Sequence, residues 1–120
     1  MSNVKQMSTA MLMYSGDADG YLSPKANWMD NITPYAKNKE IFHCPAVDSE
    51  KFGYAYNFMC AGSQVSVLPK PAKTSLIFDS TVLTKNTVRT AVTFPRPGRH
   101  DGKNTIGYVD GHVTQEAPPR

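Results

Sequence analysis

Residues 104–117, NTIGYVDGHVTQEA, decide the fold of this chain. Two runs of strand-forming residues flank Asp110-Gly111, and Asp-Gly is a pair that a type I′ turn favours. The stretch therefore predicts a β-hairpin near the C-terminal end of the chain. Asp110 is then the turn residue and His112 begins the returning strand, which favours an architectural role for both.

The segment before the hairpin, RHDG at 99–102, adds a histidine and a second Asp-Gly pair. His100 and Asp101 could join Asp110 and His112 in a metal site or an acid–base pair. However, the sequence has no G-x-S-x-G nucleophile elbow, no H-E-x-x-H and no phosphate-binding glycine loop. We therefore expect His100 to bond nearby backbone or Asp110 and to fix the loop onto the hairpin. The chain is expected not to be an enzyme, and a hydrolase that uses His100 and Asp110 is the weakest hypothesis.

The N-terminal residues 1–15 predict one amphipathic helix. Ser2 or Asn3 can cap its start, and Gly16 follows its end. Its apolar residues recur every three or four positions, as they do along one face of a helix. The expected packing face consists of Val4, Met7, Met11 and Tyr14.

Further along the chain, the pattern changes from helical to strand-like. Residues 16–50 predict a loop and short helical turns, two of which meet at Thr33 because Pro34 is unfavourable in a helix interior. Residues 51–116 predict antiparallel strands. Strands that follow a helix indicate an α+β fold, with the helix laid on one face of the sheet. We expect a single domain over residues 1–120.

Length and charge limit the classes of function. The chain has 120 residues, of which 40% are hydrophobic and 19% charged, as expected for one folded domain. Its formal net charge is +3, and its Lys and Arg residues are scattered, whereas nucleic-acid binders concentrate them on one face. No nucleic-acid partner is therefore expected. No stretch approaches the roughly 20 apolar residues of a membrane helix, so membrane contact is expected only through an N-terminal segment absent from this chain.

The cysteines and the aromatic residues leave alternatives open. Cys44 and Cys60 could form a disulfide in an oxidising compartment or remain two buried thiols. An exposed aromatic surface would suggest a glycan or a protein as ligand, whereas a buried one would belong to the core. The aromatic residues in question are Trp28, Tyr35, Tyr54, Tyr56, Phe58 and Tyr108.

The loop after the helix, SGDADGYLS at 15–23, matches the middle of an EF-hand calcium loop. Asp17 and Asp19 supply two carboxylates before a turn glycine. The bidentate Glu that ends the template falls at Ala26, so other oxygens would have to complete the site. Ca²⁺ is therefore a candidate cofactor with Asp17 and Asp19 as ligands, and a solvated turn is the alternative.

These segments together resemble the pseudopilin-like proteins that carry a prepilin-processing-associated H-X9-DG domain and are abundant in planctomycetes and related bacteria. His100, nine intervening residues and Asp110-Gly111 match the motif that gives the domain its name. Further stretches resemble the family in the same order. They are SNVKQMSTAMLMYSGDADGYLSP at 2–24, WMDNITPYAKNKEIFHCPAV at 28–47, FGYAYN at 52–57 and SLIFDS at 75–80.

The resemblance implies a type IV pilin-like fold, in which an N-terminal helix packs on an antiparallel sheet. It also implies self-association and a location at the bacterial cell surface or outside the cell. Family members begin with a basic leader and an apolar helix that anchors the precursor in the inner membrane, and this sequence contains neither. We therefore expect a soluble fragment or a variant that assembles differently, with an inner-membrane-anchored precursor if that helix exists.

Two hypotheses on function follow. The leading one is a structural subunit of a cell-surface filament or of a type II secretion-like pseudopilus, of which this chain is the soluble head. The alternative is a small extracellular binding module for a glycan or a surface protein, with calcium as a candidate requirement.

Overall fold

The computed structural model describes most of the chain in six stretches. They are residues 2–36, 39–42, 53–68, 70–80, 85–89 and 104–116. The helices within them are α1 (Ser2–Asp17), α2 (Trp28–Ala36) and the short 3₁₀-helices η1 (Lys39–Phe42) and η2 (Val65–Val67). The strands are β1 (Tyr54–Asn57), β2 (Ser75–Asp79), β3 (Val88–Arg89), β4 (Asn104–Tyr108) and β5 (Val113–Glu116). The predicted α+β class is confirmed.

The five described strands form one mixed sheet in the order β3-β1-β2-β4-β5. β2 pairs antiparallel with both β1 and β4, and β5 pairs antiparallel with β4. β3 instead pairs parallel with β1, with Tyr56 opposite Val88. The expectation of a purely antiparallel sheet is therefore wrong. The chain crosses from β2 past β1 to the far edge, so β3 runs antiparallel to β2 and hence parallel to β1.

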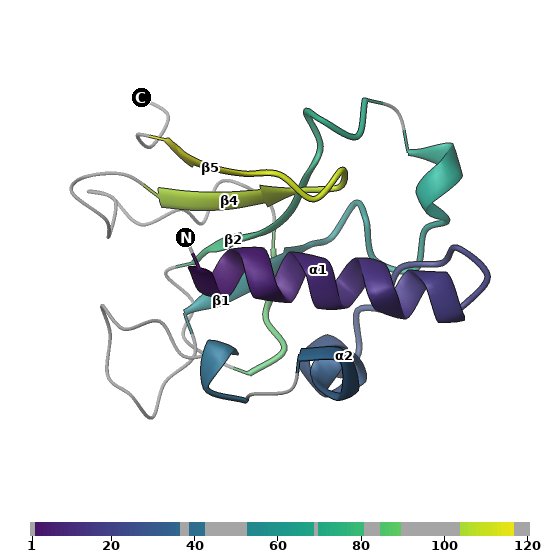
Figure 1. Ribbon diagram of the computed structural model, residues 1–120, viewed down its shortest axis with the longest axis horizontal. Coiled ribbons are helices and arrows are strands. Elements are labelled where there is room, and N and C mark those ends of the chain that lie inside the picture. Colours follow the sequence, from purple (N-terminus) through teal and green to yellow (C-terminus); the bar gives the residue numbers. More distant parts are fainter. Residues whose placement is uncertain are drawn as a thin grey trace.

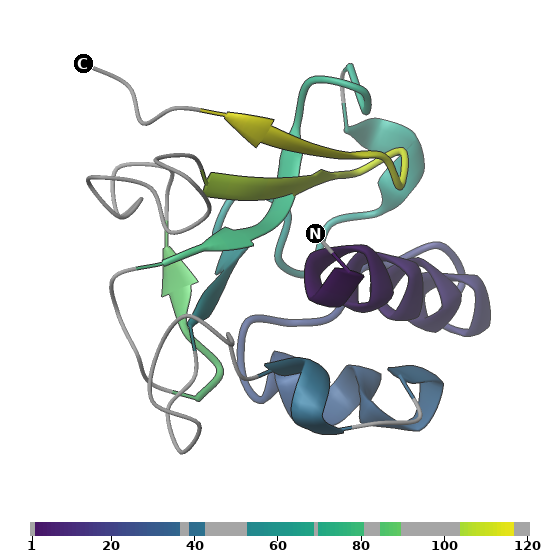
Figure 2. The same cartoon turned by 60° about the vertical axis from the view of Figure 1, so that its left-hand side comes forward.

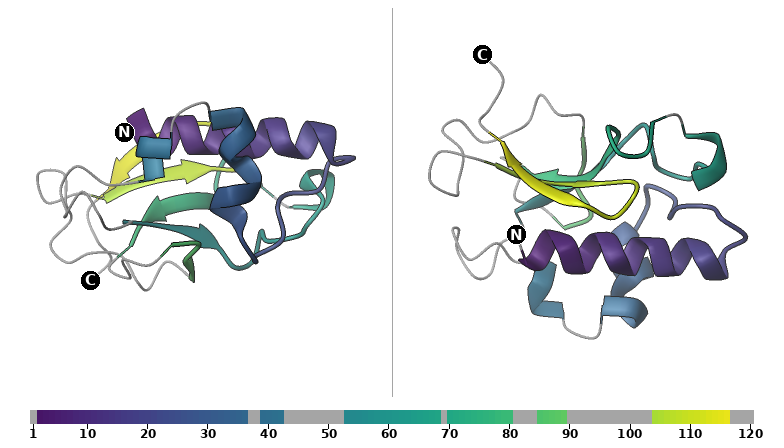
Figure 3. Two further views of the ribbon diagram at one scale, coloured as in Figure 1. Left: turned by 90° about the horizontal axis from the view of Figure 1, so that it is seen from below. Right: turned by 45° about the horizontal axis from the view of Figure 1, so that its top comes forward.

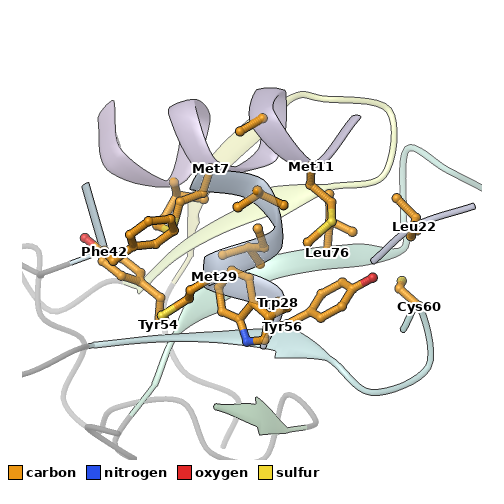
Figure 4. Close-up of a cluster of buried hydrophobic side chains, with 14 of the residues drawn as sticks. Met7, Met11, Leu22, Trp28, Met29, Phe42, Tyr54, Tyr56, Cys60 and Leu76 are labelled. Atoms are coloured by element: carbon orange, nitrogen blue, oxygen red, sulfur yellow. The ribbon is translucent and has the colours of Figure 1, made fainter. Parts of the chain in front are cut away.

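Both α-helices lie on the same face of the sheet (Figures 1, 2 and 3). α1 contacts β2, β4 and α2, and α2 reaches the sheet through the ring of Trp28, which packs against that of Tyr56. The helix-facing side chains of the strands and the buried side chains of the helices form one core. Figure 4 shows part of it, with Met7, Met11, Trp28, Met29, Tyr54, Tyr56 and Leu76. Full burial of one such side chain stabilises the fold by about 1.5–3 kcal/mol.

The packing face of α1 largely coincides with the predicted one. Val4, Met7 and Met11 are fully buried. Tyr14 is only partly buried, and its ring meets that of Tyr35 on α2 edge-on, with the ring centroids 6.3 Å apart. Neither α-helix in the described stretches combines the length and the apolar character needed to cross a bilayer.

α2 is one continuous helix, so the predicted pair of turns meeting at Thr33 is wrong. Pro34 lies in its last turn, and Thr33 is not an N-cap: its hydroxyl donates to the Met29 carbonyl oxygen at 2.7 Å. The start of the helix is held from the segment before β3, where the Asn86 side-chain oxygen accepts from the Met29 backbone N–H at 2.8 Å. The Trp28 indole N–H adds a hydrogen bond to the Thr87 carbonyl oxygen at 2.9 Å.

The opposite face of the sheet also carries buried side chains. Ala55, Phe78 and Ile106 form a second apolar cluster there, and Tyr108 packs against it. These residues alternate along the strands with residues that face the helices, as the period of two in a β-strand requires. The sheet is therefore buried on both faces near its centre.

Candidate functional site

The turn between β4 and β5 contains the Asp-Gly pair of the H-X9-DG motif. The Gly111 N–H donates to the Tyr108 carbonyl oxygen at 2.9 Å, and the Tyr108 N–H donates to the His112 carbonyl oxygen at 2.9 Å. Gly111 has a φ of 96°, whereas Asp110 has no positive φ. A type I′ turn needs positive φ at both central residues, so the expected two-residue turn is wrong. The loop has three residues, Val109 to Gly111, and glycine supplies its single left-handed position.

This turn is tied to the N-terminal helix. The Lys5 ammonium on α1 donates to the Gly111 carbonyl oxygen at 2.7 Å. Leu12, two turns further along α1, lies close to Gly111, because a Cβ placed on that glycine would be 3.5 Å from the Leu12 side chain. The turn and α1 are therefore held together by a polar contact at Lys5 and an apolar contact at Leu12.

The Asp110 carboxylate is used within the turn. Its Oδ1 accepts from the His112 backbone N–H at 3.1 Å and also pairs with Nδ1 of the His112 ring. That ring stacks flat on Tyr108, with the centroids 4.4 Å apart. The hydrogen bond from the His112 side chain, followed by that from its backbone, lowers the pKa of Asp110. The carboxylate therefore serves as a turn clamp.

The residues that fix this turn differ in part from those expected. His100, the expected clamp, lies outside the described residues, as does Asp101, so the predicted role of His100 stays a prediction. Lys5 and His112 contact the turn through their side chains, and the backbone N–H groups of Val109 and Asp110 donate to the carbonyl oxygens of Thr74 and Pro71 at 3.0 and 3.3 Å. A local sequence pattern could not reveal Lys5, which lies 106 residues from its partner in the chain.

α1 and β4 come unusually close at Gly107. A Cβ on Gly107 would lie 2.2 Å from Ser8 Oγ and 2.9 Å from Val4 Cγ1, and both distances are too short for real contacts. Only a residue without a side chain fits a strand at such a position. Gly107 thus sets how deeply the N-terminal helix sits on the sheet.

The predicted calcium loop follows the end of α1. Asp17 and Asp19 are both exposed, and Asp19 has a φ of 56°. Asp17 Oδ2 accepts the Tyr35 hydroxyl at 2.7 Å, and this bond raises the pKa of Tyr35. Ca²⁺ takes six to eight oxygen ligands, so backbone carbonyls and water would have to supplement the two carboxylates. Calcium binding here stays a prediction.

Cys60 is a free, fully buried thiol among the described residues. Its Sγ donates to the Ser75 carbonyl oxygen at 3.4 Å. Burial raises the pKa of Cys60 to about 11. Cys44 itself lies outside the described residues.

The aromatic residues divide between core and surface. Trp28, Tyr54 and Tyr56 are fully buried and belong to the core. Tyr35 and Tyr108 are partly buried, and Phe58 lies just beyond the end of β1, where 54% of it is exposed. The aromatic set therefore does not form one exposed platform.

The described residues hold no group of three or more His, Cys, Asp or Glu side chains placed to bind a metal ion. Comparison of the chain with family models, curated proteins and solved structures found no match. The described contacts around the DG turn join the hairpin to α1.

Proposed function

We propose that this chain is the head domain of a pilin-like or pseudopilin-like structural subunit, which associates with copies of itself in a cell-surface filament or a type II secretion-like pseudopilus. The observation that carries the proposal is the joint between the two ends of the fold. Lys5 and Leu12 of the N-terminal helix hold Gly111 in the C-terminal hairpin. In this proposal, the Asp-Gly pair that resembles the family motif has a structural role, because it joins the C-terminal hairpin to the N-terminal helix.

A structural role is also supported by how the polar groups of the motif are used. The Asp110 carboxylate is engaged by His112, and the Gly111 carbonyl oxygen by Lys5. A catalytic carboxylate must reach a proton on a bound substrate, whereas this one is already occupied within a turn. A filament subunit instead needs a head domain whose fold stays rigid when neighbouring subunits pack against it.

The fold class agrees with this role. The contacts of α1 with β2 and β4 support a pilin-like head, in which an N-terminal helix would pack on a sheet, although the sheet here is mixed. In this proposal the head lies at the bacterial surface or outside the cell. An apolar segment before α1 would anchor its precursor in the inner membrane.

Sedimentation velocity over a wide range of protein concentration tests the proposal. We expect the weight-average sedimentation coefficient to rise with concentration and to fall again on dilution, because self-association is reversible by mass action. A single species of monomer mass at every concentration would contradict it. Reversal on dilution is the control that separates assembly from aggregation.

A further inference from the structure

Two adjacent apolar side chains protrude from the turn that follows β1. Phe58 is 54% exposed and Met59 is 70% exposed. They directly follow a strand whose Tyr54 and Tyr56 are buried, and the chain then returns to the buried Cys60 (Figure 4). The exposure is therefore confined to the turn.

Hydrogen bonds hold this turn in shape. The Asn57 side-chain oxygen accepts from the Met59 N–H at 2.9 Å, and its amide nitrogen donates to the Ser75 carbonyl oxygen at 2.7 Å. The Cys60 N–H closes the turn by donating to the Asn57 carbonyl oxygen at 2.9 Å. Phe58 and Met59 thus project from a fixed backbone, so little conformational entropy remains to be lost when a partner covers them.

Positive charge flanks the two side chains. Lys25 Nζ lies 5.7 Å from the centroid of the Phe58 ring, within the range of a cation–π interaction. The Phe58 N–H donates to the Arg89 carbonyl oxygen at 3.2 Å, which makes Arg89 a backbone neighbour of the turn, and the Arg89 guanidinium donates to the Val88 carbonyl oxygen at 2.8 Å. Lys25 and Arg89 are both exposed. The turn itself, residues 57–63, contains no Asp or Glu.

We propose that these four residues, Lys25, Phe58, Met59 and Arg89, form a docking patch for an anionic lipid surface. Apolar side chains that enter the interface, ringed by cations that meet the headgroups, are the usual means of peripheral membrane binding. A nucleic acid would stack on rings and pair with cations, but Met59, the more exposed of the two, offers neither a ring nor a hydrogen-bond donor. This inference goes beyond the filament role and does not depend on it.

Flotation with lipid vesicles tests the patch directly. We expect the chain to float with vesicles that contain phosphatidylglycerol, to stay behind with pure phosphatidylcholine, and to lose binding at high salt. The double variant Phe58→Ser/Met59→Ser should lose flotation. The double variant Lys25→Gln/Arg89→Gln should bind anionic vesicles on the order of 25-fold more weakly, because each cation near such a surface contributes a factor of about five.

Met13→Ser is the matched control. Met13 is 50% exposed on α1, but it lies one helical turn before Asp17 and so has an acidic neighbour. This variant should bind as the unaltered chain does. All variants should keep the thermal unfolding midpoint of the parent, and the single variant Met59→Ser replaces the double one if they do not.

Three results would overturn the proposal. The first is the absence of flotation with anionic vesicles, and the second is unchanged flotation of the Phe58→Ser/Met59→Ser variant. The third is binding to a short DNA duplex that the serine variant retains while vesicles are not bound. That last result would indicate that Lys25 and Arg89 bind a nucleic acid and not a lipid surface.

Discussion

Replacing Gly107 by alanine places a methyl group where α1 meets β4. The new Cβ would lie 2.2 Å from Ser8 Oγ and 2.9 Å from Val4 Cγ1, and 3.4 Å from the Ile77 carbonyl oxygen. Ser8 and Val4 are themselves buried, so neither can swing out into solvent. The helix must therefore move away from the sheet, or Ser8 must leave its present rotamer.

Such overpacking of a core costs about 1–3 kcal/mol. The loss of glycine's freedom in the unfolded chain offsets about 0.4–1 kcal/mol of that cost. The midpoints of these two ranges leave a net cost of about 1.3 kcal/mol, so we expect Gly107→Ala to lower the free energy of unfolding by about 1–2 kcal/mol. For a chain of 120 residues this corresponds to a fall in Tm of about 4–8 °C.

Urea unfolding followed by tryptophan fluorescence measures this change, because Trp28 is the only tryptophan and is fully buried. Gly16→Ala is the matched control. Gly16 lies in α1 with a negative φ, and nothing lies within 4 Å of a Cβ placed on it. Alanine there should stabilise the chain by about 0.5–1 kcal/mol. Replacement of glycine by alanine is thus expected to lower the free energy of unfolding at Gly107 and to raise it at Gly16.

The double variant Ser8→Ala/Gly107→Ala tests whether the loss of stability comes from the clash between the new Cβ and Ser8 Oγ. Ser8 Oγ is buried without a hydrogen-bond partner in the described structure, so Ser8→Ala alone should be nearly neutral. Together with Gly107→Ala it should recover at least about 0.5 kcal/mol, the lower end of coupling between residues in contact. If Gly107→Ala is as stable as the parent, α1 does not sit on β4 as described and the reasoning is wrong.

Three further predictions concern other parts of the fold. Asn86→Ala removes the acceptor that caps α2 at Met29 and should cost about 1 kcal/mol of unfolding free energy, measured by urea unfolding. The Cys60 thiol, with a pKa of about 11, should be inert to a thiol reagent at pH 8 in the folded protein and react at once in denaturant. Because the pKa of Asp110 is lower in the folded state than in the unfolded state, where it is about 3.9, the ionised carboxylate stabilises the fold at pH values above 3.9. This stabilisation is lost as the pH falls through the lower pKa of the folded state. Asp110→Asn should therefore narrow the difference in Tm between neutral and strongly acid solution, and an unchanged difference would show that the clamp by His112 has no effect on stability.

Periodicity was sufficient to predict α1, because Val4, Met7 and Met11 are spaced so that a helix buries all three. It failed for α2, where Pro34 suggested a break at Thr33. The proline is tolerated in the last turn of a helix whose start is secured by Asn86, 57 residues away from Met29. Local sequence contains no sign of such a distant cap.

The hairpin shows the same limit on a smaller scale. Asp110-Gly111 correctly marks a chain reversal between β4 and β5, but the pair alone could not distinguish two loop residues from three. In the three-residue loop, the backbone and the ring of His112 both bind Asp110. The parallel pairing of β3 was equally hidden, because a strand of two residues has no pattern of its own.

At the candidate site, the Asp-Gly pair identified the right turn, where Asp110 binds His112, and further contacts come from Lys5 and Leu12 on α1. Lys5 reads as an ordinary exposed residue of an amphipathic helix until the fold brings it to Gly111. Gly107 carries a signal in the sequence, since glycine inside a strand often marks a close approach of backbone. Phe58 follows Tyr54 and Tyr56 at the spacing of one strand face, but β1 ends at Asn57.

Electron microscopy of the purified, concentrated chain tests the proposed filament role most directly. We expect filaments or regular oligomers built from repeating heads, with α1 and the C-terminal hairpin together in each head. A field of separate single heads at every concentration would contradict the proposal that this domain is built to associate with itself.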